Sequence, residues 1–463
     1  MTAGDACPGI LDLHEARDGL VARIRLPGGY ATGRRLRDLA ALASRFGNGC
    51  VDLTARGNVQ LRGIRADEAD DLAGRAASVG LLPAPDHDRA RNITASPLAG
   101  LAGHPDLRRL VRALDYTVRA DPALAALPGR FLFCLDDGTG RAGLSGCDVG
   151  LRLRPRVASP ADNLGKAAGG TADLIVAGRE TGLHGPVQQV VRQAIEMARA
   201  FLEQRPAVPS SASPGSTGPG SASPGGAGQG STPPGSTAPG SMRVSGLPDG
   251  GAAITAALGG VLGEKVTDVM TRLPLGPVTG SAPLGADPLP LAVVAAPLGR
   301  LTAAQLRLIG SMVRPGEAAR LTSAGRVVLP LAEPVDMTLT RLSGAGLLVS
   351  DEHVLSAVTA CSGMSCSKSL ADVRAQATRV PGLGAVHWAG CSRRCGRPAD
   401  ATAVVATGAD EFIVTGGPAG RVQTHPDGPA EPALTHPDGP AGPALTHADD
   451  PAAPASAHAG ARG

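Results

Sequence analysis

Hydrophobic and polar residues alternate in the same order in two stretches of the chain, one in each half. Alternating apolar and polar positions predict a strand, and apolar residues three or four apart predict a helix. The order strand, helix, strand is found in residues 20–29, 33–47 and 50–64, and again in residues 291–300, 302–313 and 318–331. The chain is therefore predicted to contain a duplicated unit.

A second pair of similar segments follows the repeated unit. Residues 91–100 resemble residues 356–365, and residues 127–138 resemble the region of residues 384–395. Each half is thus predicted to consist of a strand-helix-strand unit followed by an α/β lobe. The two halves are expected to be related by a pseudo-twofold axis.

The two copies of the second predicted strand differ in their polar residues. Thr54, Gly57, Val59 and Leu61 correspond to Thr322, Gly325, Val327 and Leu329. By contrast, Arg56 and Gln60 face Ala324 and Val328. Residues at even spacing on a strand share a face, so we expect Arg56, Gln60 and Arg62 to point to one side. The first copy is therefore the predicted carrier of polar chemistry.

Composition limits the classes of protein to which the chain can belong. A length of 463 residues with 43% hydrophobic residues is enough for two or three domains with cores. A net charge of +3 and 2% aromatic residues argue against nucleic acid as a partner. The N-terminus lacks the pattern of a signal peptide, and no apolar run approaches the roughly 20 residues of a membrane helix. We expect a cytoplasmic protein that does not enter a membrane.

Two segments have the composition of disordered chain. Residues 206–241 contain no charged residue and are rich in Pro, Gly and Ser, which predicts a flexible linker. From about residue 417 an eleven-residue unit beginning Thr-His repeats, and its Pro and Gly content excludes a helix. The tail is therefore predicted to be disordered.

Four of the eight cysteines form two close pairs. Cys361 and Cys366 form one pair, and Cys391 and Cys395 form the other. Two pairs of thiolates on turns favour a four-iron cubane cluster, and the spacing leaves zinc or unligated thiols open as alternatives. The remaining cysteines lack such pairing and are predicted to act as small buried hydrophobes; these are Cys7, Cys50, Cys134 and Cys147.

Three motifs together resemble the nitrite and sulfite reductase superfamily. They are TARGNVQLRGI at 54–64, Arg91-Asn92, and the two cysteine pairs followed by GRP at 396–398. The resemblance implies an α+β fold with a pseudo-twofold duplicated nitrite/sulfite-reductase-like architecture, in which two ferredoxin-like half-domains accompany two α/β lobes. It also implies a 4Fe-4S cluster on Cys361, Cys366, Cys391 and Cys395. One departure is the first pair, which has four intervening residues where the family has five.

The resemblance divides the chain into six parts. They are a first ferredoxin-like half-domain (1–86), a first α/β lobe (87–205), the linker (206–242), a second ferredoxin-like half-domain (243–345), an iron-sulfur cluster lobe (346–416) and the tail (417–463).

Within the superfamily, the chain is similar to the precorrin-3B synthase family. The similarity lies in LPGRFLFCLDDG at 127–138, SKSLADV at 367–373 and GCSRRCGRP at 390–398. That family uses molecular oxygen to hydroxylate C20 of precorrin-3A and close a γ-lactone in aerobic cobalamin synthesis. Membership implies a tetrapyrrole substrate, a 4Fe-4S cluster with non-haem iron, and electrons from an external NAD(P)H-dependent reductase or a ferredoxin. A sirohaem-dependent sulfite or nitrite reductase and a non-catalytic iron-sulfur electron carrier are the alternatives.

The resemblance also implies which residues bind the tetrapyrrole carboxylates. Arginine offers a planar fork of donors that pairs with a carboxylate. The matching positions are Arg56, Gln60, Arg62, Arg91 and Arg130. Leu132 stands where the reductases carry a lysine that contacts their anionic substrate. No catalytic residue is assigned.

Glycines 138, 140 and 143 spell GxGxxG, the pattern of a dinucleotide-binding loop. The residues after them alternate like a strand, whereas a dinucleotide fingerprint opens a helix. We therefore expect a hairpin turn and no nucleotide site here.

Overall fold

The computed structural model describes residues 7–154, 170–205, 242–269, 272–278, 289–379, 384–398 and 401–415, and the backbone of 421–423. The predicted linker over 206–241 and most of the predicted tail lie outside these residues. Residues 421–423, within the range predicted as tail, form the strand β20 (Arg421–Gln423), which pairs with β19 (Glu411–Thr415).

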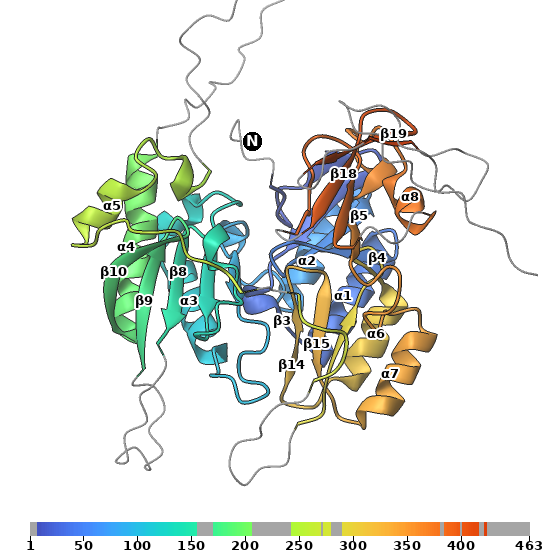
Figure 1. Cartoon of the computed structure of the whole chain (residues 1–463), viewed down its shortest axis with the longest axis horizontal. Coiled ribbons are helices and arrows are strands. Elements are labelled where there is room, and N and C mark those ends of the chain that lie inside the picture. The colour runs from blue at the N-terminus through green and yellow to red at the C-terminus, as the bar shows by residue number, and fades with distance from the viewer. Residues whose placement is uncertain are drawn as a thin grey trace, which may run out of the picture.

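Two five-stranded antiparallel sheets form the centre of the molecule (Figure 1). The first contains β1 (His14–Ala16), β2 (Gly19–Ile24), β5 (Val59–Ile64), β4 (Cys50–Leu53) and β13 (Arg300–Thr302), in that order. The second contains β11 (Gly276–Pro277), β12 (Leu291–Ala295), β15 (Arg326–Pro330), β14 (Ala318–Leu321) and β3 (Tyr30–Thr32). Each half-domain thus gives one strand to the other's sheet: β13 pairs with β4, and β3 pairs with β14. The predicted duplication is confirmed, and the exchange joins the two copies.

Each predicted second strand is in fact a hairpin of two strands. In the first copy, the Thr54 amide donates to the Asn58 carbonyl at 2.9 Å and the Gly57 amide to the Thr54 carbonyl at 3.1 Å. Thr322 makes the same bonds with Arg326 and Gly325 in the second copy. A Thr-x-x-Gly turn therefore interrupts the alternating pattern, and Arg56 lies in this turn. The expectation that Arg56 shares a strand face with Gln60 and Arg62 was wrong.

Two helices of each copy cover the two central sheets, and the first helix of each copy begins with a capping threonine. Helices α1 (Gly33–Phe46) and α2 (Ala69–Ser78) belong to the first copy, and α6 (Ala303–Met312) and α7 (Val335–Gly344) belong to the second. Thr32 caps α1 by accepting from the Arg35 amide, and Thr302 caps α6 in a capping box with Gln305.

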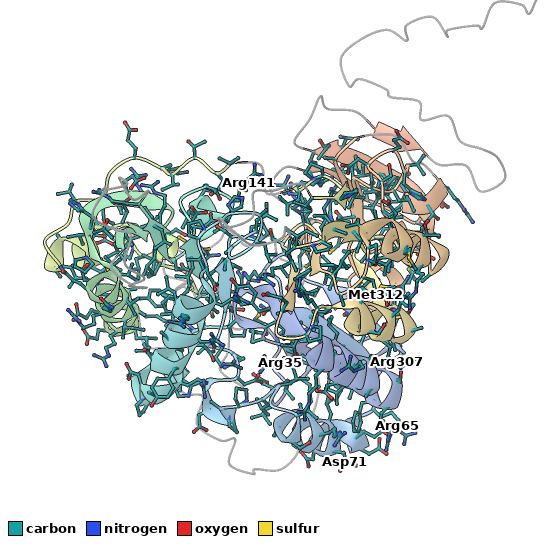
Figure 2. The ribbon with its side chains drawn as sticks, turned by 90° about the horizontal axis from the view of Figure 1, so that it is seen from below. Arg35, Arg65, Asp71, Arg141, Arg307 and Met312 are labelled. Atoms are coloured by element: carbon teal, nitrogen blue, oxygen red, sulfur yellow. The ribbon has the colours of Figure 1, made fainter. Side chains whose placement is uncertain are left out.

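Helices α1 and α6 pack side by side (Figure 2) and share one hydrophobic core with both sheets. Their backbones approach closely at two glycines. A Cβ on Gly310 would lie 2.8 Å from the carbonyl oxygen of Gly33. The contact between the two copies therefore depends on glycine at this point.

The two lobes repeat a second topology. The first lobe orders its strands as β10 (Arg179–Pro186), β9 (Thr171–Val176), β8 (Val149–Leu153), β7 (Phe133–Asp136) and β6 (Ile93–Ala95). The cysteine-bearing lobe orders β16 (Val358–Ala360), β17 (Val386–Ala389), β18 (Thr402–Ala406), β19 and β20. In each lobe three parallel strands are followed by two antiparallel ones. The predicted α+β, pseudo-twofold architecture is confirmed.

Helices α3 (Arg108–Ala120), α4 (Val187–Gln204) and α5 (Ala252–Ala257) belong to the first lobe, and α8 (Val373–Arg379) belongs to the cysteine-bearing lobe (Figure 1). In the described part of the chain, no helix combines the length and the apolar character needed to cross a bilayer.

Two sequence expectations about the first lobe need correction. Strands β7 and β8 are parallel, so the glycines at 138, 140 and 143 lie in a crossover loop and not in a hairpin turn. The strand expected after them is present. Residues after the linker return to the first lobe, because Val244, Leu247 and Ile254 belong to its core. The second half-domain therefore begins later than residue 243.

Candidate functional site

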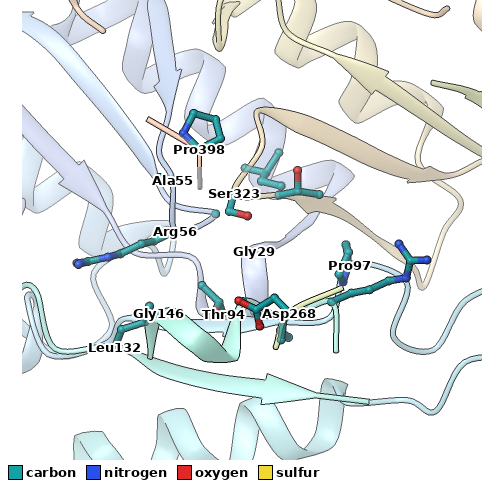
Figure 3. Close-up of a pocket in the computed structure, with 18 of the residues that line it drawn as sticks. Gly29, Ala55, Arg56, Thr94, Pro97, Leu132, Gly146, Asp268, Ser323 and Pro398 are labelled. Carbon is teal, nitrogen blue, oxygen red and sulfur yellow. The ribbon is translucent and has the colours of Figure 1, made fainter. Parts of the chain in front are cut away.

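A cleft of about 540 Å³ lies where the half-domains meet the two lobes (Figure 3). Its walls are the turns of the two hairpins, the loop after β7, the segment around Asp268, and Arg397 with Pro398 beyond the last cysteine. This volume is within the range of about 300–1,000 Å³ typical of small-molecule pockets. Every domain of the described structure thus contributes to one concave site.

The charged side chains that line the cleft are mostly positive. Arg56, Arg141, Arg243, Arg320 and Arg397 line it. Among the described residues in its lining, Asp268 is the sole carboxylate, and Asp268 accepts hydrogen bonds from the amide and hydroxyl of Ser145. Such a lining favours a ligand with several negative charges.

Arg56 reaches one edge of the cleft from the first hairpin turn (Figure 3). Its Nη1 donates to the carbonyl oxygen of Gly129 at 3.2 Å, and the Asn92 side chain donates to the same oxygen. Burial, and then the neighbouring Arg243, lower the pKa of Arg56. An anion beside Arg56 would offset the cost of burying its charge and the repulsion from Arg243.

Two further arginines are fixed in the walls of the cleft. Arg320 is 1% exposed, and its guanidinium carbon lies 5.0 Å from the centre of the Tyr30 ring. Burial lowers the pKa of Arg320. Arg243 pairs through Nε with the buried Asp148 at 2.6 Å. These arginines are held in place by protein contacts before any ligand binds.

Of the five residues predicted to bind carboxylates, the structure brings Arg56 alone into the lining of the cleft. Gln60 accepts from Arg23 at 3.0 Å, and Arg62 pairs with Asp18 at 2.9 Å. Arg91 pairs with Asp115 at 2.7 Å, and Arg130 is exposed at the surface. The roles of these four residues in ligand binding remain predictions.

Sequence patterns did not identify Arg141, Arg243 or Arg320 as residues of the cleft. Arg243 directly follows the linker, Arg141 follows the second glycine of a loop read as a turn, and Arg320 lies on a buried strand. Arg397 had a signal, because it belongs to the GRP motif after Cys395.

Cys361, Cys366, Cys391 and Cys395, here called the cysteine quartet, lie at the carboxyl ends of β16 and β17. Burial raises the pKa of Cys395, and the three other thiols of the quartet raise it further. The four sulfurs are therefore electrostatic neighbours. In the residues that the structure covers, no three His, Cys, Asp or Glu side chains converge tightly enough to hold a single metal ion. A cubane cluster lies between its ligands, so it needs four thiolates that surround a larger space.

Backbone amides point at the first cysteine of the quartet. The amides of Gly363 and Gly390 donate to the Cys361 sulfur at 3.4 and 3.3 Å. Burial raises the pKa of Cys361, and these two amides act in the opposite direction. Amide donors to sulfur stabilise a thiolate and tune the potential of a bound cluster. The donor set of the quartet therefore fits the predicted 4Fe-4S cluster.

Comparisons with known proteins relate the first half-domain to a described family. Residues 14–79 match the family described as nitrite/sulfite reductase ferredoxin-like half domain. A ferredoxin-nitrite reductase of Leptolyngbya laminosa is 37% identical over 117 residues, which are 24% of this chain and 23% of that protein. A precorrin-3B synthase of Sinorhizobium sp is 34% identical over 155 residues, which are 32% of each. The chain thus matches less than a third of the length of these relatives.

The structural comparison extends over most of the chain. The NirA protein of Mycobacterium tuberculosis has a TM-score of 0.61 with 19% sequence identity, and the match covers 88% of this chain and 77% of NirA. This similarity reports the fold. Residues 14–79 thus match a nitrite/sulfite reductase ferredoxin-like half domain, and the fold of NirA, with its duplicated sheets, extends over most of the chain.

Proposed function

We propose that the protein is a precorrin-3B synthase, an oxygen-dependent monooxygenase that converts precorrin-3A to precorrin-3B. The observation that carries the proposal is the cleft lined by five arginines and one carboxylate. Precorrin-3A is a tetrapyrrole ringed by acetate and propionate groups, and arginine is the side chain best suited to pair with several carboxylates. The 34% identity to a precorrin-3B synthase supports the same reaction.

The apolar part of the cleft supports a tetrapyrrole substrate over an inorganic anion. Leu132 lines the cleft, where the sequence resemblance to the reductases places a lysine. Reduction of sulfite or nitrite builds up negative charge in a partly desolvated site, which needs a positive donor at that point. A leucine offers none, but it can contact the face of a macrocycle.

The reaction needs two electrons and two protons besides oxygen. One oxygen atom enters the substrate at C20, the other leaves as water, and a ring-A acetate then closes the γ-lactone. A 4Fe-4S cluster on the quartet would supply electrons one at a time. Arg397 and Pro398 follow Cys395 closely and line the cleft, so the quartet is adjacent to the proposed substrate. Non-haem iron is part of the proposal, without assigned ligands.

The electrons would come from an external NAD(P)H-dependent reductase or a ferredoxin. Cys395 is exposed, as are Arg393 and Arg394 beside it. Exposed positive charge next to a redox group attracts an acidic electron-transfer protein and accelerates its encounter. In this proposal the donor approaches the quartet from the cytoplasm, and the substrate enters the cleft separately.

A sirohaem-dependent nitrite or sulfite reductase is the second candidate, because the chain shares 37% identity with a ferredoxin-nitrite reductase over a quarter of its length. The visible spectrum of anaerobically purified protein, followed by pyridine extraction, separates the two enzymes. A synthase shows a broad cluster absorption and yields no sirohaem. Stoichiometric sirohaem, together with methyl-viologen-driven reduction of nitrite or sulfite, would instead support the reductase.

A further inference from the structure

The loop after β7 is wrapped around one buried carboxylate. Asp136, the last residue of β7, is 0% exposed. Its Oδ1 accepts from the amides of Gly138 at 2.8 Å and Gly140 at 2.9 Å. Its Oδ2 accepts from the Ser96 hydroxyl at 3.0 Å and the Ala142 amide at 3.0 Å. A single side chain therefore fixes the path of the loop.

Two of these four donors flank Arg141, which lines the cleft. Gly140 and Ala142 bind different oxygens of the Asp136 carboxylate, so the backbone on both sides of Arg141 is held. Gly138 and Gly140 have φ values of 97° and 74°, a region in which other residues are strained. The GxGxxG pattern thus provides a backbone path that brings successive amides to Asp136. Figure 2 shows Arg141 at the side of the first lobe that faces the other domains.

Among the residues that the structure covers, the charge of Asp136 has no partner of opposite sign. In the described part of the chain, no arginine or lysine forms an ion pair or hydrogen bond with it. A buried carboxylate is costly unless its oxygens are fully hydrogen-bonded, and here amides and one hydroxyl do this. Strand pairing does not need a carboxylate at this position, and its hydrogen bonds go to Ser96 and to amides of the loop, so they act on the path of the loop.

The pseudo-twofold repeat shows what this loop replaces. Ser96 occupies the position of Cys361 in the repeated segments. The Ser96 oxygen accepts from the Asp137 amide at 3.1 Å, as the Cys361 sulfur accepts from the Gly390 amide at 3.3 Å. The ends of the first two parallel strands therefore hold the quartet in the cysteine-bearing lobe. The equivalent strand ends in the first lobe hold the loop of Arg141.

We propose that Asp136 is a positioning residue that holds Arg141 in the cleft, where Arg141 binds one carboxylate of the tetrapyrrole and contributes to substrate specificity. The proposal rests on the proposed function for the identity of the ligand. A loop fixed at both neighbours of Arg141 loses little entropy when the guanidinium pairs with a carboxylate. Loosening the loop therefore weakens substrate binding through Arg141.

The test measures the dissociation constant and the KM of precorrin-3A for Asp136→Asn, Arg141→Ala and the double variant. Asparagine keeps the size of the side chain, but its NH2 group cannot accept, so one of the two pairs of donors loses its acceptor. We expect each single variant to weaken binding by roughly 10- to 100-fold, and the double variant to equal Arg141→Ala. A merely structural effect would lower the fraction of folded protein and kcat and leave KM unchanged.

Asp249→Asn is the matched control, because Asp249 also accepts from two backbone amides in the first lobe but does not line the cleft. Its binding should equal that of the wild type. If Asp136→Asn does not fold, Gly140→Ala replaces it, since alanine is strained at a φ of 74°. Unchanged affinity in Gly140→Ala would overturn the proposal.

The remaining outcomes distinguish failure of the positioning role of Asp136 from failure of the proposed function. The positioning role of Asp136 would be refuted if Arg141→Ala weakened binding and Asp136→Asn did not. Additive effects in the double variant would refute it as well. Either result would leave the proposed function intact. Normal binding by Arg141→Ala with weak binding by Arg56→Ala would refute the role of Arg141 alone. Normal binding by all these variants would contradict the proposed function as well.

Discussion

The guanidinium of Arg62 donates from Nη2 to the carbonyl oxygen of Ser365 at 2.7 Å, and so joins a strand of the first half-domain to the loop that carries the first cysteine pair. Ser365 directly precedes Cys366. Arg62 also donates to the Ser362 hydroxyl at 3.2 Å and forms a bidentate pair with Asp18. The resemblance implied that Arg62 contacts substrate, whereas its observed contacts hold the cysteine loop.

Arg62→Ala should therefore act on stability and on the quartet. Breaking a buried ion pair lowers the free energy of unfolding by about 3–5 kcal/mol. Because the Asp18 side chain is 23% exposed, we expect Arg62→Ala to lower it by about 2–3 kcal/mol. Urea unfolding and iron retention after exposure to air are the measurements. Arg65→Ala is the control, because Arg65 pairs with Asp67 at the surface, where such pairs contribute about 0–1 kcal/mol. Equal effects of the two substitutions would contradict the role of Arg62.

Cys391→Ser and Cys395→Ser should abolish the cluster and the activity, because a cubane that lacks one thiolate is exposed to solvent and oxygen. Iron and acid-labile sulfide are quantified in anaerobically purified protein. Cys50→Ser serves as control, since Cys50 lies on β4 and is not part of the quartet. Iron and sulfide contents equal to those of the wild type in the quartet variants would refute the assignment.

The glycine contact between α1 and α6 is expected to tolerate no side chain. A Cβ on Gly310 would lie 2.8 Å from the Gly33 carbonyl oxygen, so Gly310→Ala should destabilise the protein by about 1–3 kcal/mol. Gly74 lies in the interior of α2 with nothing within 4 Å of such a Cβ. Gly74→Ala should stabilise by about 0.5–1 kcal/mol. Thermal melting of both variants checks the prediction, and two melting shifts of the same sign would oppose it.

The segment 206–241 should be dispensable for folding. The residues on either side of it are already in contact, since Arg205 Nη2 lies 3.9 Å from the Met242 sulfur. Replacing the segment by six Gly and Ser residues should stabilise the protein by about 1.5 kcal/mol, because a shorter loop costs less entropy to close. Unfolding free energy and precorrin-3A turnover are compared with the intact chain. A loss of turnover would show that the segment has a function beyond connection.

Periodicity and internal repetition predicted the duplicated architecture well. The hydrophobic pattern of residues 33–47 and 302–313 corresponds closely to α1 and α6, because amphipathic helices bury one face. The same pattern could not reveal the Thr54 turn, since an alternating sequence continues across a tight hairpin. It could not reveal the strand exchange between β3 and β14 either, because strand pairing depends on contacts distant in the sequence.

The candidate site was harder to predict for a related reason. The cysteine pairs and Arg56 stand in motifs, so their spacing is visible in the chain. Arg243 enters the cleft because the chain returns to the first lobe after the linker, where Asp148 binds it. Arg141 lines the cleft from a loop whose Gly140 and Ala142 amides donate to Asp136. The placement of Arg243 depends on a contact distant in the sequence, and the local bonds to Asp136 do not reveal from the sequence which way the loop faces.

The central claim is that the protein inserts one atom of molecular oxygen into precorrin-3A. It is tested most directly by incubating the purified protein with precorrin-3A and a suitable electron donor under isotopically labelled oxygen gas. Mass spectrometry reports whether the product has gained an oxygen atom from the gas. If the protein is a monooxygenase, the product carries one labelled oxygen, and labelled water is the second product. Arg56→Ala should raise the KM for this conversion. A product without the label, or recovery of unchanged precorrin-3A by protein that contains its full iron, would contradict the assignment.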